Sequence, residues 1–406
     1  MNACILTIGD ELLQGFTINT NSSWIAKTIE PYNIYIKKII TIGDEHNTII
    51  SETKKILNND IDFLFVTGGV GPTHDDVTKK AFCKLFKDEL IFDEVYYAYL
   101  QKLFINQNKV LPKINKSQAM IPKKASSMPN DMGSALGIYY FQKNIHIFIM
   151  PGVPNEMKNI VKNHIIPNYI NTPPLKNHIT IKTAGIMESV LSEKVDVLMK
   201  KYASTFSFAF LPHYNGVAFR IRPKNKSNNL EKVKNVFVNN MKPYAYGTDN
   251  DTLESALAQS LIKKNYSIAT AESCTGGLIS KRLTDTSGSS TYFIGGITAY
   301  SNKIKINLLD ISKESLKKHG AVSEAIALEM AESIRKKMNS DIGISTTGIS
   351  GPDGGNNKKP VGLVYIGVAT PITSIVKKYI FKVNRSIHRE MVATAALNTT
   401  RILLEK

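Results

Sequence analysis

The stretch AESCTGGL, residues 271–278, indicates how the C-terminal part of this chain folds. A short apolar segment at 266–270 precedes it and predicts a buried strand, and residues 278–284 follow with helical spacing. The stretch is therefore predicted to be a strand-to-helix turn whose two glycines let the backbone approach a ligand. It places two nucleophilic side chains, Ser273 and Cys274, at a helix N-terminus, which favours an oxyanion or a phosphate.

A purely structural role explains the same residues equally well when the stretch is taken alone. Serine and threonine ahead of a helix are common N-caps, and a Gly-Gly pair is common in turns. The rest of the chain must therefore decide between a catalytic turn and a capped helix.

Length and composition favour a soluble protein of several domains. The 406 residues suit two or three domains of roughly 100–200 residues each. Hydrophobic residues make up 43% of the chain and charged residues 21%, and no apolar run approaches the roughly 20 residues of a membrane span. The cysteines, Cys4, Cys83 and Cys274, have no metal-type spacing. We therefore expect a cytoplasmic protein without a membrane segment.

The net charge of +17 raises the question of nucleic-acid binding. The lysines are scattered along the whole chain, as the pairs at 54–55, 123–124, 200–201 and 377–378 illustrate. A nucleic-acid footprint would concentrate charge on one face. The composition therefore argues against nucleic acid as a partner and favours small anionic ligands.

Strand and helix patterns alternate in the N-terminal part of the chain. The expected strands are 3–8, 34–42, 63–67 and 146–150, and the expected helices are 23–29, 49–57, 77–86 and 96–104. Such βαβ patterning implies a parallel sheet that is covered by helices.

Two further domains are expected beyond a proline-marked break at 166–174. We expect three domains in this α/β protein: 1–172, a small α+β domain at 173–248, and 249–406, where strand and helix patterns alternate again. The expected elements of the middle domain are strand 179–184, helix 189–201, an alternating stretch at 206–221 and helix 230–241. Those of the last domain are helices 252–264, 323–338 and 387–404 and strands 266–270, 293–299, 342–346, 362–370 and 376–383.

A glycine-rich loop follows the third expected strand of the first domain. It contains Gly68, Gly69, Gly71 and Thr73. Open α/β sheets bind ligands at the C-terminal ends of their strands, and the free N–H groups of a glycine-rich turn can hold a phosphate. The loop is therefore a candidate binding site for a nucleotide.

Acidic residues follow the same strand ends. Asp75 and Asp76 come directly after the glycine-rich loop, and Asp10 and Asp44 follow the first and second strands. The C-terminal ends of parallel strands meet at one edge of the sheet, and carboxylates are the hard oxygen ligands that Mg²⁺ prefers. These four residues are the expected ligands of a divalent metal. For Asp75 or Asp76 taken singly, capping of the following helix is the better interpretation.

These segments resemble the N-terminal domain of the CinA family, which is related to molybdopterin-binding domains. The resemblance rests on residues 9–12, 67–78 and 151–157, which occur in that order. It implies a three-layer fold and an ADP-ribose pyrophosphatase that uses a divalent metal such as Mg²⁺. One departure is Ser134, which stands where relatives carry threonine and keeps the hydroxyl group.

The last domain supplies partners for the serine of the opening turn. Tyr300, Lys303 and Lys305 follow an expected strand. A serine hydroxyl is a weak nucleophile until a base takes its proton, and a lysine in a dry pocket can do so with help from a tyrosine. Neither His319 nor His388 stands in a motif, so a Ser-Lys-Tyr arrangement is favoured over Ser-His-Asp. A surface lysine on a helix is the competing interpretation for either lysine alone.

A second glycine-rich loop and two arginines complete the candidate site. The loop at 347–355 includes Thr347 and Gly348 and suits a phosphate or a ribose, although a flexible connector explains it too. Arg385 and Arg389 lie at i and i+4 on one face of the last expected helix, where guanidinium groups can bind phosphate.

Residues 252 to 406 resemble the C-terminal domain of CinA proteins, a nicotinamide mononucleotide deamidase of the PncC type. The resemblance implies hydrolysis of the carboxamide of nicotinamide mononucleotide to nicotinic acid mononucleotide and ammonia, without a cofactor. The implied roles are nucleophile for Ser273, base for Lys305 in preference to Lys303, positioning or relay for Tyr300, oxyanion binding for the N–H groups of Thr275, Gly276 and Gly277, and nucleotide binding for Thr347, Gly348, Arg385 and Arg389. Cys274 is expected to point away from Ser273 and to be packed.

The middle domain resembles the KH-like linker domain of full-length CinA proteins. Residues 178–247 contain no Gly-x-x-Gly loop, which a KH domain needs to grip a nucleic-acid backbone. We therefore expect an architectural or dimerising module, and the family implies a homodimer. The alternative function is that of a non-catalytic nucleotide- or pterin-binding regulatory protein, which would not require Ser273, Tyr300 and Lys305 together.

Overall fold

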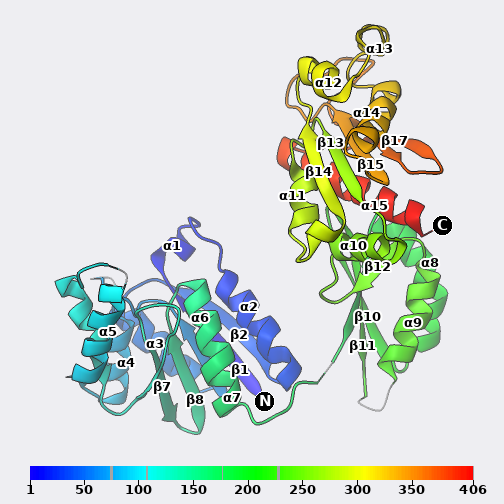
Figure 1. The fold of residues 1–406 in the computed structure, drawn as a ribbon. Coiled ribbons are helices and arrows are strands. Elements are labelled where there is room, and N and C mark those ends of the chain that lie inside the picture. Colours follow the sequence, from blue (N-terminus) through cyan, green and yellow to red (C-terminus); the bar gives the residue numbers. More distant parts are fainter. Residues whose placement is uncertain (74–75, 107, 176, 226–228, 406) are drawn as a thin grey trace. The chain divides into compact units, whose positions relative to one another are not determined.

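The chain forms two compact units, Met1–Lys176 and Asn177–Lys406, and each combines helices with sheets (Figure 1). The computed structural model describes residues 1–73, 76–106, 108–175, 177–225 and 229–405. Asp75, one of the expected metal ligands, lies outside the described residues. In the described part of the chain, no helix combines the length and the apolar character that a membrane crossing requires.

The first unit contains a six-stranded sheet with the order β2-β1-β3-β8-β7-β6. Its strands are β1 (Asn2–Ile8), β2 (Tyr35–Ile42), β3 (Phe63–Thr67), β6 (Ser126–Met128), β7 (Gly137–Gln142) and β8 (Ile145–Met150). The first four strands in the sheet order are parallel, as predicted. The last two strands were not expected: β7 is antiparallel to β8, and β6 is antiparallel to β7. Lys143 and Asn144 join β7 to β8 with φ angles of 53° and 62°, the left-handed conformation of a tight hairpin.

Helices cover both faces of this sheet. They are α1 (Asp10–Leu13), α2 (Thr20–Ile29), α3 (His46–Ile56), α4 (Thr78–Phe86), α5 (Glu94–Asn106), α6 (Pro154–Ile160) and α7 (Ile166–Tyr169), with a small sheet of β4 (Leu90–Phe92) and β5 (Met120–Pro122) beside them. Side chains of β1 alternate between the faces. Cys4, Leu6 and Ile8 pack in the apolar cluster that includes residues of α3 and α4, whereas Ala3 and Ile5 pack in the cluster that includes residues of α2 and α6. This alternation produces the expected three layers.

The second unit begins with a four-stranded antiparallel sheet of order β10-β11-β9-β12. Its elements are β9 (Ile179–Thr183), α8 (Glu188–Tyr202), β10 (Phe206–His213), β11 (Gly216–Pro223), α9 (Leu230–Asn240) and β12 (Ala245–Thr248). The alternating stretch predicted at 206–221 is the hairpin of β10 and β11. Phe219 and Phe237 pack at the centre of a core that belongs to this sheet and its two helices.

The last helix of the chain ties this small sheet to the C-terminal part of the same unit. Arg401 is buried and donates hydrogen bonds to the carbonyl oxygen of Pro243 (2.6 Å) and to Asn398 (2.9 Å). Thr394 also donates to the side chain of Asn215 (2.9 Å). The predicted domains 173–248 and 249–406 thus form, from Asn177 onward, one compact unit with separate apolar cores.

A five-stranded sheet of order β14-β13-β15-β16-β17 organises the rest of the unit. Its elements are α10 (Leu253–Lys264), β13 (Ile268–Glu272), α11 (Leu278–Thr284), β14 (Phe293–Thr298), α12 (Asn302–Leu309), α13 (Lys313–His319), α14 (Glu324–Lys337), β15 (Ile342–Gly348), β16 (Leu363–Ala369), β17 (Ser374–Ile380) and α15 (Arg385–Leu404). Strand β13 is parallel to both of its neighbours, β14 and β15. Strand β16 is antiparallel to β15 and to β17, because no helix separates β15, β16 and β17 along the chain.

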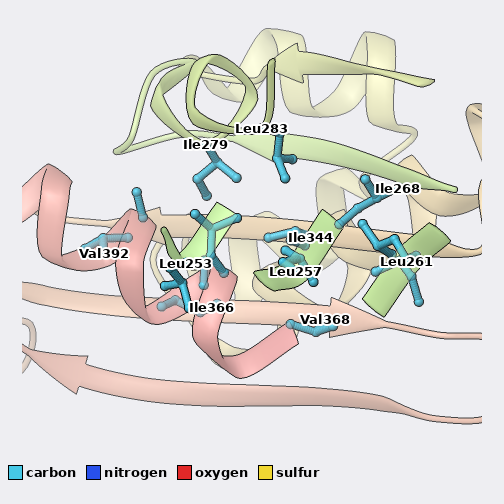
Figure 2. Close-up of a cluster of buried hydrophobic side chains, with 14 of the residues drawn as sticks. Leu253, Leu257, Leu261, Ile268, Ile279, Leu283, Ile344, Ile366, Val368 and Val392 are labelled. Carbon is cyan, nitrogen blue, oxygen red and sulfur yellow. The ribbon is translucent and has the colours of Figure 1, made fainter. Parts of the chain in front are cut away.

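Strand β13 lies between β14 and β15, and its end leads into the predicted nucleophile turn, residues 273–277. Figure 2 shows Leu253, Leu257 and Leu261 of α10 packed beside Ile344 and Ile366 of the sheet. Helix α14 covers the opposite face. Each fully buried leucine or isoleucine contributes about 1.5–3 kcal/mol of stability. The end of β13 is therefore held in a rigid three-layer core.

Candidate active site

The predicted strand-to-helix turn is present, but the strand begins two residues later than expected. The N–H of Tyr266 bonds back to the carbonyl of Leu261, and Asn265 ends α10 in a left-handed conformation, so the start of the predicted strand belongs to a turn. Beyond β13, Gly276 and Gly277 have φ angles of 59° and 92°. Only glycine adopts such angles without strain, so both glycines are needed for the shape of the turn.

A glutamate caps the helix that follows the turn. The buried carboxylate of Glu272 accepts hydrogen bonds from the N–H of Ile279 (3.0 Å) and from the N–H and hydroxyl of Ser280 (both 2.8 Å). The positive end of α11 is therefore already neutralised by a side chain of the protein. The cap engages the N–H groups of Ile279 and Ser280, whereas the expected oxyanion donors, the N–H groups of Thr275, Gly276 and Gly277, lie in the turn before α11.

Ser273 is held at the end of β13 by the neighbouring strand. Its N–H donates to the carbonyl of Thr346 in β15 (3.0 Å), and its own carbonyl accepts from Gly276 (3.2 Å). The side chain is 9% exposed. Its hydroxyl therefore occupies a fixed position at the edge of the sheet where parallel strands end.

Lys305 on helix α12 lies beside this hydroxyl. Its Nζ is 3.1 Å from Ser273 Oγ and donates to the carbonyl oxygens of Ala299 (2.7 Å) and Tyr300 (3.3 Å). Ser301 caps α12 and thereby sets its starting point, one turn before Lys305. The lysine is 1% exposed, so the interpretation of a surface lysine is wrong for this residue.

Burial makes Lys305 easier to deprotonate. The desolvation of its ammonium group lowers the pKa to about 8, from the ordinary value of 10.5. None of the ion pairs among the described residues includes Lys305, so no carboxylate opposes this shift. A substantial fraction of the side chain is therefore neutral near physiological pH.

Cys274 points into the core, as expected. Its side chain packs in the apolar cluster of α10, α11 and α15, and burial raises the pKa of its thiol to about 12. A thiol in this environment stays protonated and is a poor nucleophile. Of the two candidate nucleophiles, Ser273 is the one whose side chain contacts Lys305.

A cavity of about 240 Å³ opens beside the serine and the lysine. It is lined by Ser273, Cys274, Tyr300, Asn302, Lys305, Ala321, Val322, Thr347, Gly348, Ser350 and Arg385. Asn302, Ala321, Val322 and Ser350 are residues that the sequence analysis did not assign to the site. They come from loops and helix starts without a chemical motif, and only the fold brings them together.

Tyr300 pairs with Arg385 across the cavity mouth. Its exposed phenol accepts a hydrogen bond from Arg385 Nη2 (2.9 Å), and Arg385 Nη1 donates to the carbonyl of Gly351 (2.9 Å). The phenol makes no hydrogen bond to Ser273 or Lys305; the contact of Tyr300 with Lys305 is through its backbone carbonyl. The tyrosine is therefore placed to orient the arginine.

Four other expected binding residues lie outside the cavity lining. Arg389 donates to the carbonyl of Thr275 through Nε (3.2 Å) and Nη2 (2.7 Å) and so braces the nucleophile turn. The hydroxyl of Thr275 is buried against Thr346 (2.7 Å), and Gly276 and Gly277 shape the turn. Thr347 does line the cavity, but its hydroxyl donates to the carbonyl of Ala321.

The first unit has a larger cavity, of about 370 Å³, at the C-terminal ends of β1, β3 and β8. It is lined by Ile8, Gly9, Glu11, Asp44, Gly68, Gly69, Val70, Gly71, Pro72, Asp76, Gln118, Ser134, Ala135, Pro151, Gly152, Val153 and Glu156. The three glycines of the predicted loop are thus at the cavity, with Asp44 and Asp76. Thr73 and Asp10 are not among the lining residues.

The carboxylates at this cavity hold the loops together. Asp44 Oδ2 accepts from the N–H of Asp10 (3.0 Å), and Asp10 Oδ1 accepts from the N–H of Asp44 (3.3 Å). Asp76 accepts from the N–H of Gly71 (2.8 Å) and from the N–H (2.7 Å) and hydroxyl (2.6 Å) of Thr73. Asp76 thus organises its own loop and does not cap α4.

The described residues do not fit the expected metal site. Residues 1–73, 76–106, 108–175, 177–225 and 229–405 contain no group of three or more His, Cys, Asp or Glu side chains that could hold a metal ion. Asp10 pairs with Asp44, and Asp76 is engaged separately, so the predicted convergence of acidic residues is only partial. Hydrogen bonds to backbone N–H groups occupy oxygen atoms that a cation would need.

Glu156 is a further acidic residue at this cavity that the sequence analysis did not select. It is half-buried, accepts a hydrogen bond from Asn130 (2.6 Å), and has its pKa raised by desolvation. Helix α6, which begins in the loop at 151–157 that the family resemblance includes, carries this side chain to the cavity.

The fold and the two cavities define a two-unit α/β protein with a glycine-loop cavity in one unit and a buried serine-lysine pair in the other. Residues 4–170 match the model of the family described as probable molybdopterin-binding domain, and residues 250–404 match that of the CinA C-terminal domain. The first match covers most of the first unit, and the second covers the C-terminal part of the second unit.

Relatives of known sequence match the whole chain. A CinA-like protein of Chloroherpeton thalassium is 39% identical over 422 residues, covering 100% of this chain and 99% of the relative. A CinA-like protein of Cytophaga hutchinsonii is 36% identical and covers 100% and 98%. A competence-damaged protein (CinA) superfamily structure from Klebsiella pneumoniae is 28% identical, covers 38% of this chain and 96% of that one, and has a TM-score of 0.37. The chain belongs to the family of CinA-like proteins.

Proposed function

We propose that this protein is an amidohydrolase that converts nicotinamide mononucleotide to nicotinic acid mononucleotide and ammonia. The observation that carries the proposal is the 3.1 Å contact between Ser273 Oγ and the buried Nζ of Lys305. Burying the charge of a lysine is unfavourable, and here the buried amine contacts a serine hydroxyl. The pair is explained if the lysine acts as a base.

The hydrogen bonds of Lys305 suit both of its protonation states. As an ammonium group it donates three hydrogen bonds, to Ser273 Oγ and to the carbonyls of Ala299 and Tyr300. As a neutral amine it keeps the two bonds to the carbonyls and turns its lone pair toward the serine hydroxyl. The carbonyls thus hold Nζ in place while the proton moves.

The proposed reaction uses this proton transfer twice. Lys305 takes the proton of Ser273 as Oγ attacks the carboxamide carbon, and it returns the proton to the departing nitrogen, so that the C–N bond breaks and ammonia leaves. Water then attacks the serine ester with Lys305 again as base, which releases the carboxylic acid and restores the hydroxyl. Cys274 borders the cavity beside Ser273, and its N–H is a proposed oxyanion donor, because the N–H of Gly276 is already bonded to the carbonyl of Ser273.

Arg385 is the proposed binding residue for the nucleotide phosphate. It borders the same cavity, and its guanidinium group is held in position by Tyr300 and Gly351. Because the side chain of this arginine is already fixed, it loses little further conformational entropy when it binds phosphate. Arg389 has no part in this role because both of its bonds go to the nucleophile turn.

The decisive experiment measures ammonia release from nicotinamide mononucleotide. The parent protein should release ammonia and nicotinic acid mononucleotide, and Ser273→Ala should abolish release with an unchanged melting temperature. Ser340→Ala is the matched control, because Ser340 is also a buried serine and lies just before the start of β15, at the opposite end of the parallel strands from Ser273. Ammonia release that survives in Ser273→Ala would overturn the mechanism. No release by the parent protein would favour the alternative, a nucleotide- or pterin-binding regulatory protein.

A second function is proposed for the first unit, cleavage of the diphosphate of ADP-ribose. The glycines at 68, 69 and 71 form one wall of a cavity that is large enough for part of a nucleotide. Because the described carboxylates do not form a metal cluster, we derive no step through a metal ion. The test is hydrolysis of ADP-ribose with and without a chelator.

A further inference from the structure

Ser350 has an unusual environment for a serine at the edge of a cavity. The residue is 5% exposed, and its hydroxyl has no hydrogen-bond partner among the described residues. A buried hydroxyl without a partner is unfavourable, and native proteins retain few such groups. Among the described residues, Ser350 is the one with such an atom that lines the Ser273–Lys305 cavity.

The position of Ser350 is fixed by the loop that follows β15. The next residue, Gly351, has a φ angle of 75°, and a side chain there would meet Val361 at 2.6 Å. The carbonyl of Gly351 accepts the hydrogen bond of Arg385 Nη1. Ser350 is therefore held directly beside the anchoring point of the arginine.

Ser350 and Ser273 reach the cavity from different elements of the fold. Ser273 is level with the end of β15, because its N–H bonds to the carbonyl of Thr346. Ser350 follows Thr346 by four residues, beyond the end of the strand at Gly348, and precedes Gly351, whose carbonyl anchors the guanidinium group of Arg385. Because Arg385 is the proposed phosphate ligand, the phosphate of a substrate whose carboxamide reaches Ser273 would lie at the loop that carries Ser350.

We propose that Ser350 is a substrate-binding residue whose hydroxyl, together with Arg385, binds the phosphate group of the nucleotide. The inference rests on the proposed deamidase function and assigns one more residue to that site. Rotation about χ1 between staggered positions turns the hydroxyl into the cavity when a ligand enters. A phosphate oxygen then accepts the hydrogen bond that the ligand-free protein lacks.

The test compares Ser350→Ala with the parent protein in three measurements. The KM for nicotinamide mononucleotide should rise about 10-fold, which is the expected loss of one hydrogen bond to a charged group, while kcat changes little. The inhibition constant of inorganic phosphate, used as a competitor, should rise by a similar factor. The melting temperature without ligand should not fall, because no hydrogen bond of the ligand-free protein is lost.

Ser340→Ala is again the matched control. The hydroxyl of Ser340 donates to the carbonyl of Ile342 (2.9 Å), away from the cavity, so this variant should melt at a lower temperature and keep the KM of the parent. If the parent is active and Ser350→Ala has an unchanged KM, the inference about Ser350 is overturned and the proposed function is not. A raised KM with an unchanged phosphate inhibition constant overturns the assignment to phosphate. A parent without deamidase activity removes the proposed function and this inference with it.

Discussion

Lys305 lies 32 residues after Ser273 in the chain, yet its Nζ is 3.1 Å from Ser273 Oγ. The other two hydrogen bonds of Nζ go to backbone carbonyls. The arrangement keeps the lysine in place without a carboxylate. An acidic partner would stabilise the ammonium form and raise the pKa, which would make the lysine a weaker base at neutral pH. The absence of such a partner around Lys305 in the described ion pairs is therefore consistent with the role of a general base.

Separate substitutions of Lys305 and Lys303 should show which of the two lysines is the base. Lys305→Met removes the base and should lower kcat for ammonia release by about 10²–10⁴-fold. Lys303→Met changes an exposed lysine on the same helix and should keep the activity of the parent. The melting temperature of Lys305→Met should not fall, because a methionine needs no solvation in the buried site. Equal losses of activity in both variants would contradict the assignment.

The activity should depend on pH through the same lysine. The reactive form is the neutral amine, and burial lowers the pKa of Lys305 to about 8, so kcat/KM should rise with pH and level off above about pH 8. The measurement is a kcat/KM profile from about pH 6 to about pH 10, across the ordinary pKa range of histidine and lysine. A profile that instead levels off near the ordinary pKa of histidine, about 6.5, would point to a different base.

The lowered pKa also has a consequence for stability. The unfolded chain holds a proton on Lys305 up to about its ordinary pKa of 10.5, whereas the folded protein releases it near 8. The unfolded state therefore binds more protons in this window, and the contribution of Lys305 to stability rises as the pH increases from about 8 to 10.5. The difference in unfolding free energy between the parent and Lys305→Met should shrink over that range in urea titrations.

Glu272 was identified from the structure and not from the sequence. Within AESCTGGL, serine and threonine are the common capping residues, yet the cap of α11 is the glutamate at the end of β13. A glutamate that reaches forward around a turn to cap a helix seven residues later has no short sequence signature. Periodicity predicted the strand and the helix, and only the conformation of the two glycines brings Glu272 over the helix end.

The two arginines illustrate the same limit. Their i and i+4 spacing places both on one face of α15, which the sequence analysis took as a common phosphate site. The two arginines have different neighbours in the structure. Arg385 lines the cavity and bonds to Tyr300, whereas Arg389 bonds to the backbone carbonyl of Thr275. Sequence spacing predicts which side chains share a helix face, but the neighbouring loops decide what each one contacts.

Glu272→Ala should destabilise the protein and disturb the nucleophile turn. The carboxylate accepts three hydrogen bonds at the start of α11, and loss of a helix cap reduces the unfolding free energy by about 1–2 kcal/mol. Urea denaturation measures this loss, and kcat should fall because the turn no longer fixes Ser273. Glu272→Gln keeps an oxygen acceptor and should recover part of both quantities. Full stability in Glu272→Ala would show that the cap is dispensable.

Arg385 and Arg389 should differ in their kinetic effects. Arg385→Lys should raise the KM for nicotinamide mononucleotide with a smaller change in kcat, because lysine cannot keep the hydrogen bonds to both Tyr300 and Gly351. Arg389→Lys should lower kcat and the melting temperature with little change in KM, because it loosens the turn at Thr275. The two assays together decide whether either arginine contacts the nucleotide; identical KM increases would return Arg389 to the binding site.

Asp76 should matter for the cavity of the first unit and not for the deamidase site. Asp76→Ala removes the acceptor of three hydrogen bonds from Gly71 and Thr73, so the glycine loop should lose its shape. Binding of ADP-ribose, followed by calorimetry, should weaken, and any hydrolysis of ADP-ribose should fall with it. Ammonia release from nicotinamide mononucleotide should stay at the level of the parent, because Ser273 and Lys305 belong to the other compact unit. Asp76→Asn retains one oxygen acceptor and should have an intermediate effect. If ADP-ribose binds both variants as tightly as the parent, the loop is not part of the binding site.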